Sequence, residues 1–453
     1  MASISTLSAI RFGYGLGGNP APGTAEQILM RLARGDLMAE KFPVVATDDA
    51  LAQAAEFREM KKAAEKNQGG SEQTLRRGRD AMRLTGALGL LHGVARILDT
   101  DDPFRERLTW FWADHFTAVA KNAAMRAAAP AYVDEAIRPN IGGKFGDMLK
   151  AVVTHPFMLA YLDQMSSVGP NSVVGKRRGR GLNENLAREV MELHTLGVGS
   201  SFVQADVRQL AELFTGLSFT RRDAFTFNAR MAEPGAETIL GKTYGGDHAD
   251  LADILQALDD LAVHPDTARH ISRKLATNLV ADEPDASLVE AMTATYRETD
   301  GDLSAIYATM LNHPAAWGPI GGKAKQPFDY IASALLALEI SGDELVKMQP
   351  RVLRPLLFQA LEGMGQPFMS ARGPDGWSEA AEDWITPNGL ATRIAWAMGV
   401  AEHFEARIAD PRRFLQNALG DAAGENLVQA VQKTATRRDA AALVLASAEF
   451  NRR

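Results

Sequence analysis

The stretch Asn183-Glu-Asn-Leu-Ala-Arg-Glu-Val-Met-Glu-Leu-His-Thr-Leu-Gly197 shows the periodicity that decides the fold of this chain. Its apolar residues recur at spacings of three and four, at Leu182, Leu186, Val190 and Leu193. This spacing places them on one face of an α-helix, because a helix repeats every 3.6 residues. Asn183 can cap the amino-terminal end of the helix, and Gly197 can stop it. We therefore predict an amphipathic helix over 183–195.

The same periodicity extends outward in both directions along the chain. It predicts helices over 24–35, 48–66, 71–98, 104–120, 124–138, 144–163, 183–195, 204–216, 249–263, 265–279, 286–298, 303–312, 327–340, 350–362, 389–403, 411–419 and 436–448. The fold class we predict is mainly α, an irregular multi-helix globular fold. The highly charged segment 57–83, with Gly69-Gly70 in its middle, predicts two exposed helical arms.

One segment interrupts the helical pattern. Phe219, Phe225 and Phe227 alternate around a short turn, which is typical of a β-hairpin. We therefore expect one small β-hairpin insertion near 217–231, packed on the helices because an isolated hairpin is only marginally stable. For the domains, we expect a main helical domain over 1–345 and a C-terminal helical region over 346–453 packed on it.

Composition excludes several classes of protein. The chain has 453 residues, of which 46 % are hydrophobic and 23 % are charged, as in ordinary globular proteins. A net charge of −7 argues against a nucleic-acid partner, and the absence of cysteine excludes disulfides and thiolate sites. No apolar run approaches the roughly 20 residues that span a bilayer, so we expect no membrane insertion. Without a visible export signal we expect a cytoplasmic protein, or a periplasmic one if it is exported with a partner.

Three motifs resemble ligand-binding loops but lack the context those loops need. Residues 11–18 are rich in glycine without a preceding strand, and we interpret them as a turn. Residues 235–243 resemble a phosphate loop with one residue too many, and we interpret them as an ordinary turn. Residues 300–304 resemble the start of a calcium loop without its later ligands, so Asp302 or Ser304 more simply caps the next helix.

The predicted helix over 183–195 carries the strongest candidate site. Asn185, Glu189 and Glu192 share one sector beside the apolar face, and carboxylates at the edge of a core either gain a raised pKa or recruit a cation. We interpret Glu189, Glu192 and His194 as acid/base groups, with Glu189 and Glu192 as ligands of a divalent cation. Arg188 would orient a carboxylate or hold an anionic substrate. The alternative is an internal network in which Arg188 neutralises Glu184 and Glu192.

Asn185 is a candidate for substrate binding, and two further groups are candidates for the same role. Asp114 and His115 follow the aromatic run Trp110-Phe-Trp112 and can line a cavity beneath it, although a satisfied core histidine is the alternative. Arg178 and Arg180 lie in a basic segment just before the acidic helix and can receive an anionic ligand, although a solvated loop is the alternative.

These residues also carry a family resemblance. The segment 183–198, then Asp206-Val207, Phe214-Thr-Gly-Leu217, Trp112-Ala-Asp-His-Phe116, His264-Pro-Asp-Thr-Ala-Arg269 and Thr299-Asp-Gly-Asp-Leu303, resembles the signature of the bacterial DUF1800 family, whose function is not established. The resemblance runs from Arg11-Phe-Gly13 to Ala446-Ser-Ala-Glu-Phe450. Many members read His-Asp where this chain has Glu233-Pro234, so a catalytic role of that histidine would not carry over. The resemblance implies a co-encoded partner of the DUF1501 family, whose members resemble exported sulfatases or phosphatases.

Two functions therefore follow from the sequence as hypotheses. The first is a hydrolase of unknown substrate that uses the acidic helix, with a divalent cation as its possible cofactor. The second is a non-enzymatic helical partner or chaperone of a co-encoded exported protein. A deep pocket lined by Glu189, Glu192 and His194 would favour the enzyme, whereas burial and pairing of these side chains beneath a flat apolar surface would favour the partner.

Overall fold

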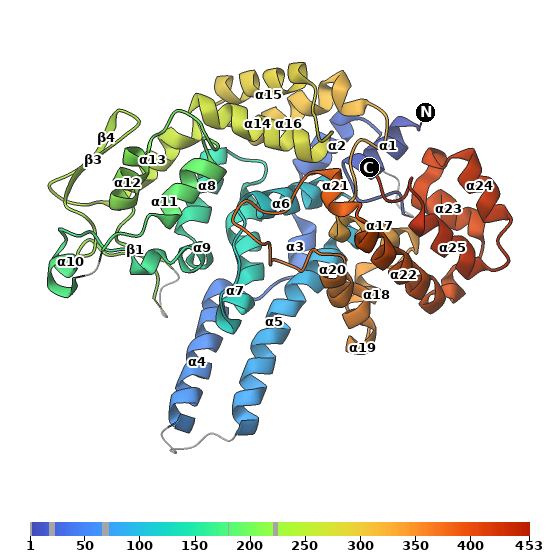
Figure 1. Cartoon of the computed structure of the whole chain (residues 1–453), viewed down its shortest axis with the longest axis horizontal. Coiled ribbons are helices and arrows are strands. Elements are labelled where there is room, and N and C mark those ends of the chain that lie inside the picture. Colours follow the sequence, from blue (N-terminus) through green and yellow to red (C-terminus); the bar gives the residue numbers. More distant parts are fainter. Residues whose placement is uncertain (1, 18–22, 66–71, 180, 221–224) are drawn as a thin grey trace.

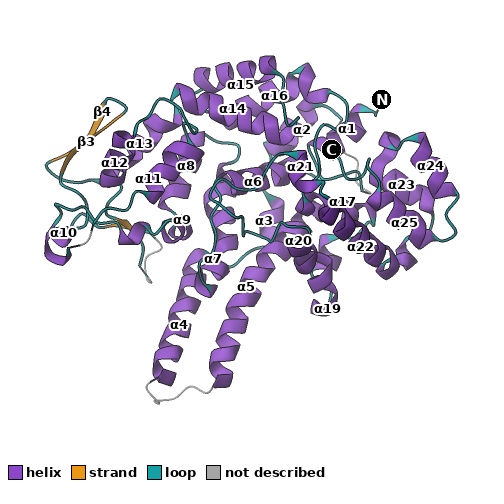
Figure 2. Ribbon diagram, viewed as in Figure 1, coloured by secondary structure: helices purple, strands orange, loops and turns teal. Residues whose placement is uncertain are grey.

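The computed structural model describes residues 2–17, 23–65, 72–179, 181–220 and 225–453. It is an arched body of helices from which one helical hairpin projects (Figure 1). Within these residues, strands occur only near one end of the arch (Figure 2). The mainly α fold with a small β-hairpin is confirmed. In the described chain no helix is both long and apolar enough to cross a bilayer.

The first third of the chain forms the amino-terminal segment, the projecting hairpin and the centre of the arch. Its helices are α1 (Ile4–Arg11), α2 (Ala25–Leu32), α3 (Leu37–Lys41), α4 (Thr47–Glu65), α5 (Glu72–Asp99), α6 (Pro103–His115), α7 (Ala123–Tyr132), the π-helix η1 (Val133–Ile137) and the 3-10 helix η2 (Arg138–Asn140).

The middle third forms the end of the arch that carries the strands and then its upper rim. Its elements are α8 (Phe145–Thr154), α9 (Pro156–Tyr161), η3 (Gln164–Ser166), α10 (Val173–Arg178), α11 (Asn185–Glu189), the π-helix η4 (Val190–His194), α12 (Gln204–Leu213), β1 (Leu217–Ser218), β2 (Thr226–Phe227), β3 (Gly235–Ile239), β4 (Lys242–Gly246), α13 (Leu251–Ala262), α14 (Pro265–Leu279), α15 (Ala286–Glu298), α16 (Leu303–Asn312) and η5 (Pro314–Trp317).

The last third forms the opposite end of the arch. Its helices are α17 (Pro327–Ala337), α18 (Gly342–Leu345), α19 (Pro350–Leu353), the π-helix η6 (Arg354–Phe358), α20 (Gln359–Gly363), α21 (Ala381–Trp384), α22 (Pro387–His403), η7 (Glu405–Arg407), α23 (Pro411–Leu419), η8 (Gly420–Ala422), α24 (Glu425–Gln432) and α25 (Arg437–Ala446).

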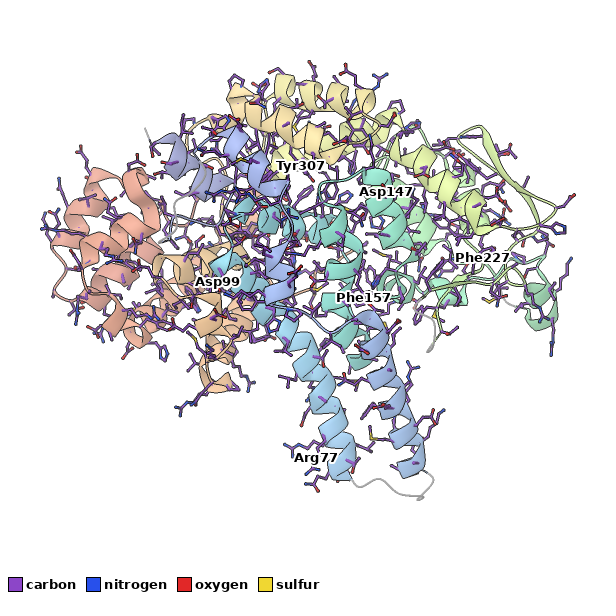
Figure 3. The ribbon with its side chains drawn as sticks, turned by 180° about the vertical axis from the view of Figure 1, so that it is seen from behind. Arg77, Asp99, Asp147, Phe157, Phe227 and Tyr307 are labelled. Atoms are coloured by element: carbon purple, nitrogen blue, oxygen red, sulfur yellow. The ribbon has the colours of Figure 1, made fainter. Side chains whose placement is uncertain are left out.

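Helix α4 and the first half of α5 form the projecting hairpin, which we call the arm. Figure 3 places Arg77 close to its free end, whereas Asp99, at the other end of α5, lies within the body. Gly78 allows the two helices to approach, because a Cβ atom there would lie 2.6 Å from the ring of Phe57. The predicted pair of exposed helices over 57–83 is confirmed, although Gly69-Gly70 lies outside the described residues.

Two large apolar clusters form the core. One surrounds Trp112, which is fully buried and donates from Nε1 to the Tyr307 hydroxyl at 2.7 Å. The other joins the second half of α5 to α17 and to helices α22 to α25, through buried residues such as Leu90, Leu335 and Val444. Residues 1–345 and 346–453 thus share the second cluster, and the boundary near residue 345 stays a prediction.

The strands form two separate antiparallel hairpins. In the predicted hairpin, Leu217 pairs with Phe227 and Ser218 with Thr226, and its turn falls outside the described residues. The second hairpin, β3–β4, corrects the expectation of a single hairpin and of an ordinary turn at 235–243. Its turn is Leu240-Gly241, and both residues have positive φ angles, of 50° and 78°. Paired positive angles suit the right-handed twist of a hairpin.

Candidate functional site

A cavity of about 100 Å³ lies where the two ends of the sequence meet. Helix α6 forms one wall of the cavity, the start of α17 forms another, and the loop between α20 and α21 covers the cavity. Its lining includes Tyr14, Arg107, Trp110, Asp114, Gln326, Phe328, Asp329, Gln366, Phe368, Ala371, Trp377 and Arg453. Tyr14 comes from residues 12–17, the part of the predicted turn that the structure describes after the end of α1. The cavity is thus built by tertiary contacts between distant segments.

The floor of the cavity holds a buried charge cluster. Arg107 donates from Nη1 to Asp329 at 2.9 Å, and Arg453 Nε lies 3.4 Å from the same carboxylate oxygen. The guanidinium of Arg107 also stacks on Tyr14, 4.2 Å from the ring centroid. The two guanidinium groups hold the pKa of Asp329 below its usual value against the opposing effect of burial. Asp329 is therefore a permanent anion that binds both arginines.

Two side-chain amides fasten the covering loop to the start of α17. Gln366 donates to the side-chain oxygen of Gln326 at 2.7 Å and accepts the backbone N–H of Phe328 at 2.8 Å. Gln326 in turn donates to the carbonyl of Ser378 at 3.2 Å. The loop is therefore held over the cavity at both of its ends.

Asp114 lies at the end of α6 and lines the cavity. Its two carboxylate oxygens accept the backbone N–H of Trp377, over 3.0 Å and 3.2 Å. Burial, and after it the negative charge of Glu379, raises the pKa of Asp114 to about 7, although this hydrogen bond and Lys274 oppose the shift. A carboxyl group in this range can release and accept a proton at neutral pH.

Lys274 of α14 is the cation that acts on Asp114, and it is partly buried. Among the side chains that the structure describes, none makes a hydrogen bond or an ion pair with it. Burial lowers the pKa of Lys274 below its ordinary value, while Asp114 and Glu379 oppose the shift. The lysine is therefore an unpaired basic group beside the carboxyl of Asp114.

Three histidines lie behind Asp114. The ring of His115 is 6.2 Å from that of His194 and 6.2 Å from that of His270, between centroids. His115 Nε2 donates to the carbonyl of His194 at 3.2 Å, and His270 Nε2 donates to the carbonyl of Leu193 at 3.1 Å. Carbonyl oxygens only accept, so both rings carry their proton on Nε2.

Burial keeps these histidines neutral. It lowers the pKa of His194 to about 3 and that of His270 to about 4, and it lowers the pKa of His115 well below its usual value. The second contribution in all three is the positive charge of Lys274. The Nδ1 atoms of His115 and His194 are buried and have no partner within the described part of the chain.

The acidic helix differs from the single α-helix predicted over 183–195. It runs as α11 and then widens into the π-helix η4, which inserts one residue into the turn. As a result His194 is buried, 1 % exposed, whereas Leu193 of the predicted apolar face is only partly buried. The extra residue explains why His194 lies on the inner side of the helix.

On the outer side of this helix Arg188 bridges two glutamates. It pairs with Glu184 and with Glu192, each at 3.1 Å, and the arginine side chain is 37 % exposed. Glu189 is partly buried and has no ion pair with any described residue. Burial, and then repulsion from Glu192, raises the pKa of Glu189 to about 7. Glu189 is therefore a second carboxyl group that titrates near neutrality.

The predicted site residues therefore fall into separate groups. Asp114 lines the cavity, and His115 and His194 lie together behind it, whereas Glu189, Glu192 and Arg188 do not line it. Asn185 is exposed, with its backbone N–H bonded to Asn183. The backbone of Arg178 ends α10, and Arg180 lies outside the described residues. Over the described ranges, no group of three or more His, Asp or Glu side chains is arranged to hold a metal ion.

Several residues of the site are not indicated by any local pattern in the sequence. Arg107, Asp329 and Arg453 are distant in sequence and meet only through the tertiary fold. Trp377 contacts Asp114 through its backbone, which leaves no trace in the choice of side chain. The one available signal was Asp329, a charged residue near the start of the mostly apolar segment 327–338.

Fold and site together define a class: a mainly α-helical protein with a small polar cavity assembled from both ends of the chain. Within that class, the chain belongs to the DUF1800 family, whose model, described as "Protein of unknown function (DUF1800)", matches residues 10–452. The family resemblance seen in the sequence is thereby confirmed. No curated protein and no solved structure matches the chain.

Proposed function

We propose that this protein is a hydrolase in which Asp114 acts as the general base and then as the general acid. The observation that carries the proposal is the position of Asp114, whose carboxyl group lines the cavity and has a pKa of about 7. A cavity with a few converging polar groups and a perturbed carboxyl is the usual geometry of an acid–base site. The unpaired Lys274 beside it supports the same proposal.

The proposed step is a hydrolysis assisted by one carboxylate. The ionised Asp114 takes a proton from a water molecule, and the water oxygen forms a bond to the electrophilic atom of the substrate. The bond to the leaving group then breaks, and the leaving group keeps the electron pair. Asp114 returns its proton to the leaving group and is ionised again, so that no other reagent is consumed.

In this proposal the acidic helix supplies a second titratable carboxyl group, that of Glu189. Glu189 shares with Asp114 the acidic neighbour Asp375, and its own pKa of about 7 allows proton exchange. A divalent cation at Glu189 and Glu192 would relieve their mutual repulsion, which is the observation in favour of a cation there. Arg188 already neutralises Glu192, which weakens the case for this cation.

The test is a comparison of Asp114→Asn with Asp102→Asn on a panel of 4-nitrophenyl esters, 4-nitroanilides and 4-nitrophenyl phosphate. Asp102 lies at the other end of α6, also has a raised pKa, about 6, and does not line the cavity. We expect the wild type to hydrolyse at least one compound at a rate that rises as pH passes about 7. The hydrolysis rate of Asp114→Asn should be roughly 100-fold or more below that of the wild type, whereas the rate of Asp102→Asn should be unchanged. No hydrolysis of any compound, or equal rates for both variants, would contradict the proposal.

A second candidate function is that of a helical partner of another protein. The observation in its favour is the arm, in which α4 and the first half of α5 project from the body (Figure 1). The charged side chains described within 56–83 are exposed. The co-encoded DUF1501-like protein is the partner implied by the resemblance. Co-purification with the intact chain, and its loss when the outer part of the arm is removed, would support this candidate.

A further inference from the structure

We infer that the cavity binds a small organic carboxylate whose charged end is held by Arg453. This inference names the substrate class of the proposed hydrolase and rests on that function, although the binding can be measured without any turnover.

Arg453 is a buried cation with spare donors. Its side chain is 2 % exposed, and its Nη2 donates to the carbonyl of Asn278 at 2.8 Å. Its Nη1 has no hydrogen-bond partner among the residues the structure describes, and its Nε, although 3.4 Å from the Asp329 carboxylate, forms no hydrogen bond there. Buried donors are nearly always satisfied in native proteins, because an unmade hydrogen bond costs roughly 1–3 kcal/mol. Since Arg453 lines the cavity, an acceptor placed there would complete its hydrogen bonds.

The charges on the cavity floor favour an acceptor with one negative charge. Arg107 and Arg453 are positive, and Asp329 neutralises one of these two charges. Burial lowers the pKa of the neighbouring Lys325 to about 7, so it contributes at most part of a charge at neutral pH. Glu379 also acts on both arginines, but it is paired with Lys323 at 3.1 Å. One positive charge is therefore left over on the floor, which matches a carboxylate better than a dianionic phosphate. The planar fork of a guanidinium also suits the two oxygens of a carboxylate.

The opposite wall favours an apolar body. The ring of Trp110 packs against Phe328 and Phe368, with centroids 5.0 Å and 5.5 Å apart, and all three rings line the cavity. The Trp110 Nε1 atom is buried and has no partner within the described residues, so it offers one more donor to a ligand oxygen. The cavity is in the size range that holds roughly a benzene-sized ring.

The position of Asp114 completes the assignment. It lines the same cavity, so a substrate whose carboxylate rests on Arg453 has its apolar body between the aromatic rings and presents the bond to be broken to Asp114. A neutral amide offers Arg453 one acceptor oxygen instead of two and no charge to balance the guanidinium, so it should bind more weakly than the carboxylate.

The experiment measures binding of phenylacetate, benzoate and cyclohexanecarboxylate to the full chain by calorimetry and by tryptophan fluorescence. Trp110 and Trp377 line the cavity and can report a bound ligand. Benzamide and inorganic phosphate serve as the neutral and dianionic probes. Three variants are compared: Arg453→Lys removes the fork, Ala371→Phe fills the cavity from its covering loop, and Arg393→Lys is the matched control. Arg393 is equally buried and also has an unpartnered Nε, but it does not line the cavity.

We expect at least one carboxylate to bind, benzamide and phosphate to bind at least about tenfold more weakly, and Arg453→Lys to lose about tenfold or more in affinity. Ala371→Phe should abolish binding, and it tests the inference even if Arg453→Lys does not fold. Arg393→Lys should bind as the wild type does. Binding of no carboxylate, equal binding of benzamide, or full binding by Ala371→Phe would overturn the inference. Carboxylate binding that survives in Asp114→Asn, with no hydrolysis by the wild type, would uphold the inference and refute the hydrolase.

Discussion

The backbone N–H of Trp377 donates to both carboxylate oxygens of Asp114, over 3.0 Å and 3.2 Å. This contact joins the end of α6 to the loop that covers the cavity, across more than half of the sequence. It also couples the charge of one carboxyl group to the position of that loop, because an ionised carboxylate accepts a stronger hydrogen bond than a neutral carboxyl group does.

The first prediction concerns Asp114 and pH. Its pKa is raised to about 7 by burial and by Glu379 and Asp375, against Trp377 N–H and Lys274, so the folded state holds the proton more tightly than the unfolded state. The resulting stability is present at low pH and is lost as pH rises from about 4 to about 7. As pH rises from 4 to 8, we expect the unfolding free energy of Asp114→Asn to increase relative to that of the wild type by on the order of 1–3 kcal/mol. Urea unfolding of both proteins checks this; a pH-independent difference would contradict it.

The second prediction concerns Gly376, which has a φ angle of 83°. A Cβ atom there would lie 2.8 Å from the carbonyl oxygen of Asp114 and 2.9 Å from its carboxylate oxygens. Gly376→Ala should therefore lower the unfolding free energy by roughly 1–3 kcal/mol and weaken carboxylate binding, because the loop must move away. Gly399→Ala is the control: it lies in α22 with open space around it and should stabilise by roughly 0.5–1 kcal/mol. Equal melting temperatures for the two variants would show that the close approach of Gly376 to Asp114 does not constrain the covering loop.

The third prediction concerns the acidic helix. Arg188 is 37 % exposed and has two acidic partners, so Glu192→Gln should cost less than about 1 kcal/mol. Glu189→Gln removes a charge whose ionisation is disfavoured in the folded state, so at pH 8 it should leave the melting temperature unchanged or raise it. If Glu189 and Glu192 bind a cation, Mg²⁺, Ca²⁺, Mn²⁺ or Zn²⁺ should raise the melting temperature of the wild type alone. A sharp loss of stability in both variants without an effect of metal would refute a functional role for these carboxylates.

The fourth prediction concerns the arm. Residues 58–79 contribute no buried side chain among those described, so replacing them by a short Gly-Ser linker should leave the melting temperature within about 2 °C of the wild type. Deletion of 50–86 is the contrasting variant, because it removes buried Ala50, Leu51 and Met82. A large loss of stability in the shorter deletion would show that the arm supports the body.

The sequence predicted most helices closely because their ends carry local signals. Helix α14 begins at Pro265 after a His264 cap, α15 follows an Asp285 cap, and α16 follows Asp302, whose side chain accepts the N–H of Ala305 as predicted. The hairpin β3–β4 was missed because its turn places Leu240 at a positive φ angle, where asparagine or glycine is expected. A bond from Leu240 N–H to Asp206, at 2.8 Å, holds that conformation, and this contact is tertiary.

The site was predicted only in part, for a related reason. Asp114 and His115 were recognised as candidates because they follow an aromatic run within one helix. The inward position of His194 depends on the π-helix η4, which a uniform 3.6-residue period cannot reveal. The pairing of Arg107 and Arg453 around Asp329 joins three separate segments, so no local pattern indicates it.

Helix α5 gives the arm a further property. It is one unbroken helix from Glu72 near the tip to Asp99 in the body, and with 28 residues it is roughly 42 Å long. On its buried half, Gly93 lies against Trp110, so closely that a Cβ atom would be 2.6 Å from the indole ring. The same indole forms a wall of the cavity. One continuous helix therefore reaches from the tip of the arm to the indole ring that forms a wall of the cavity.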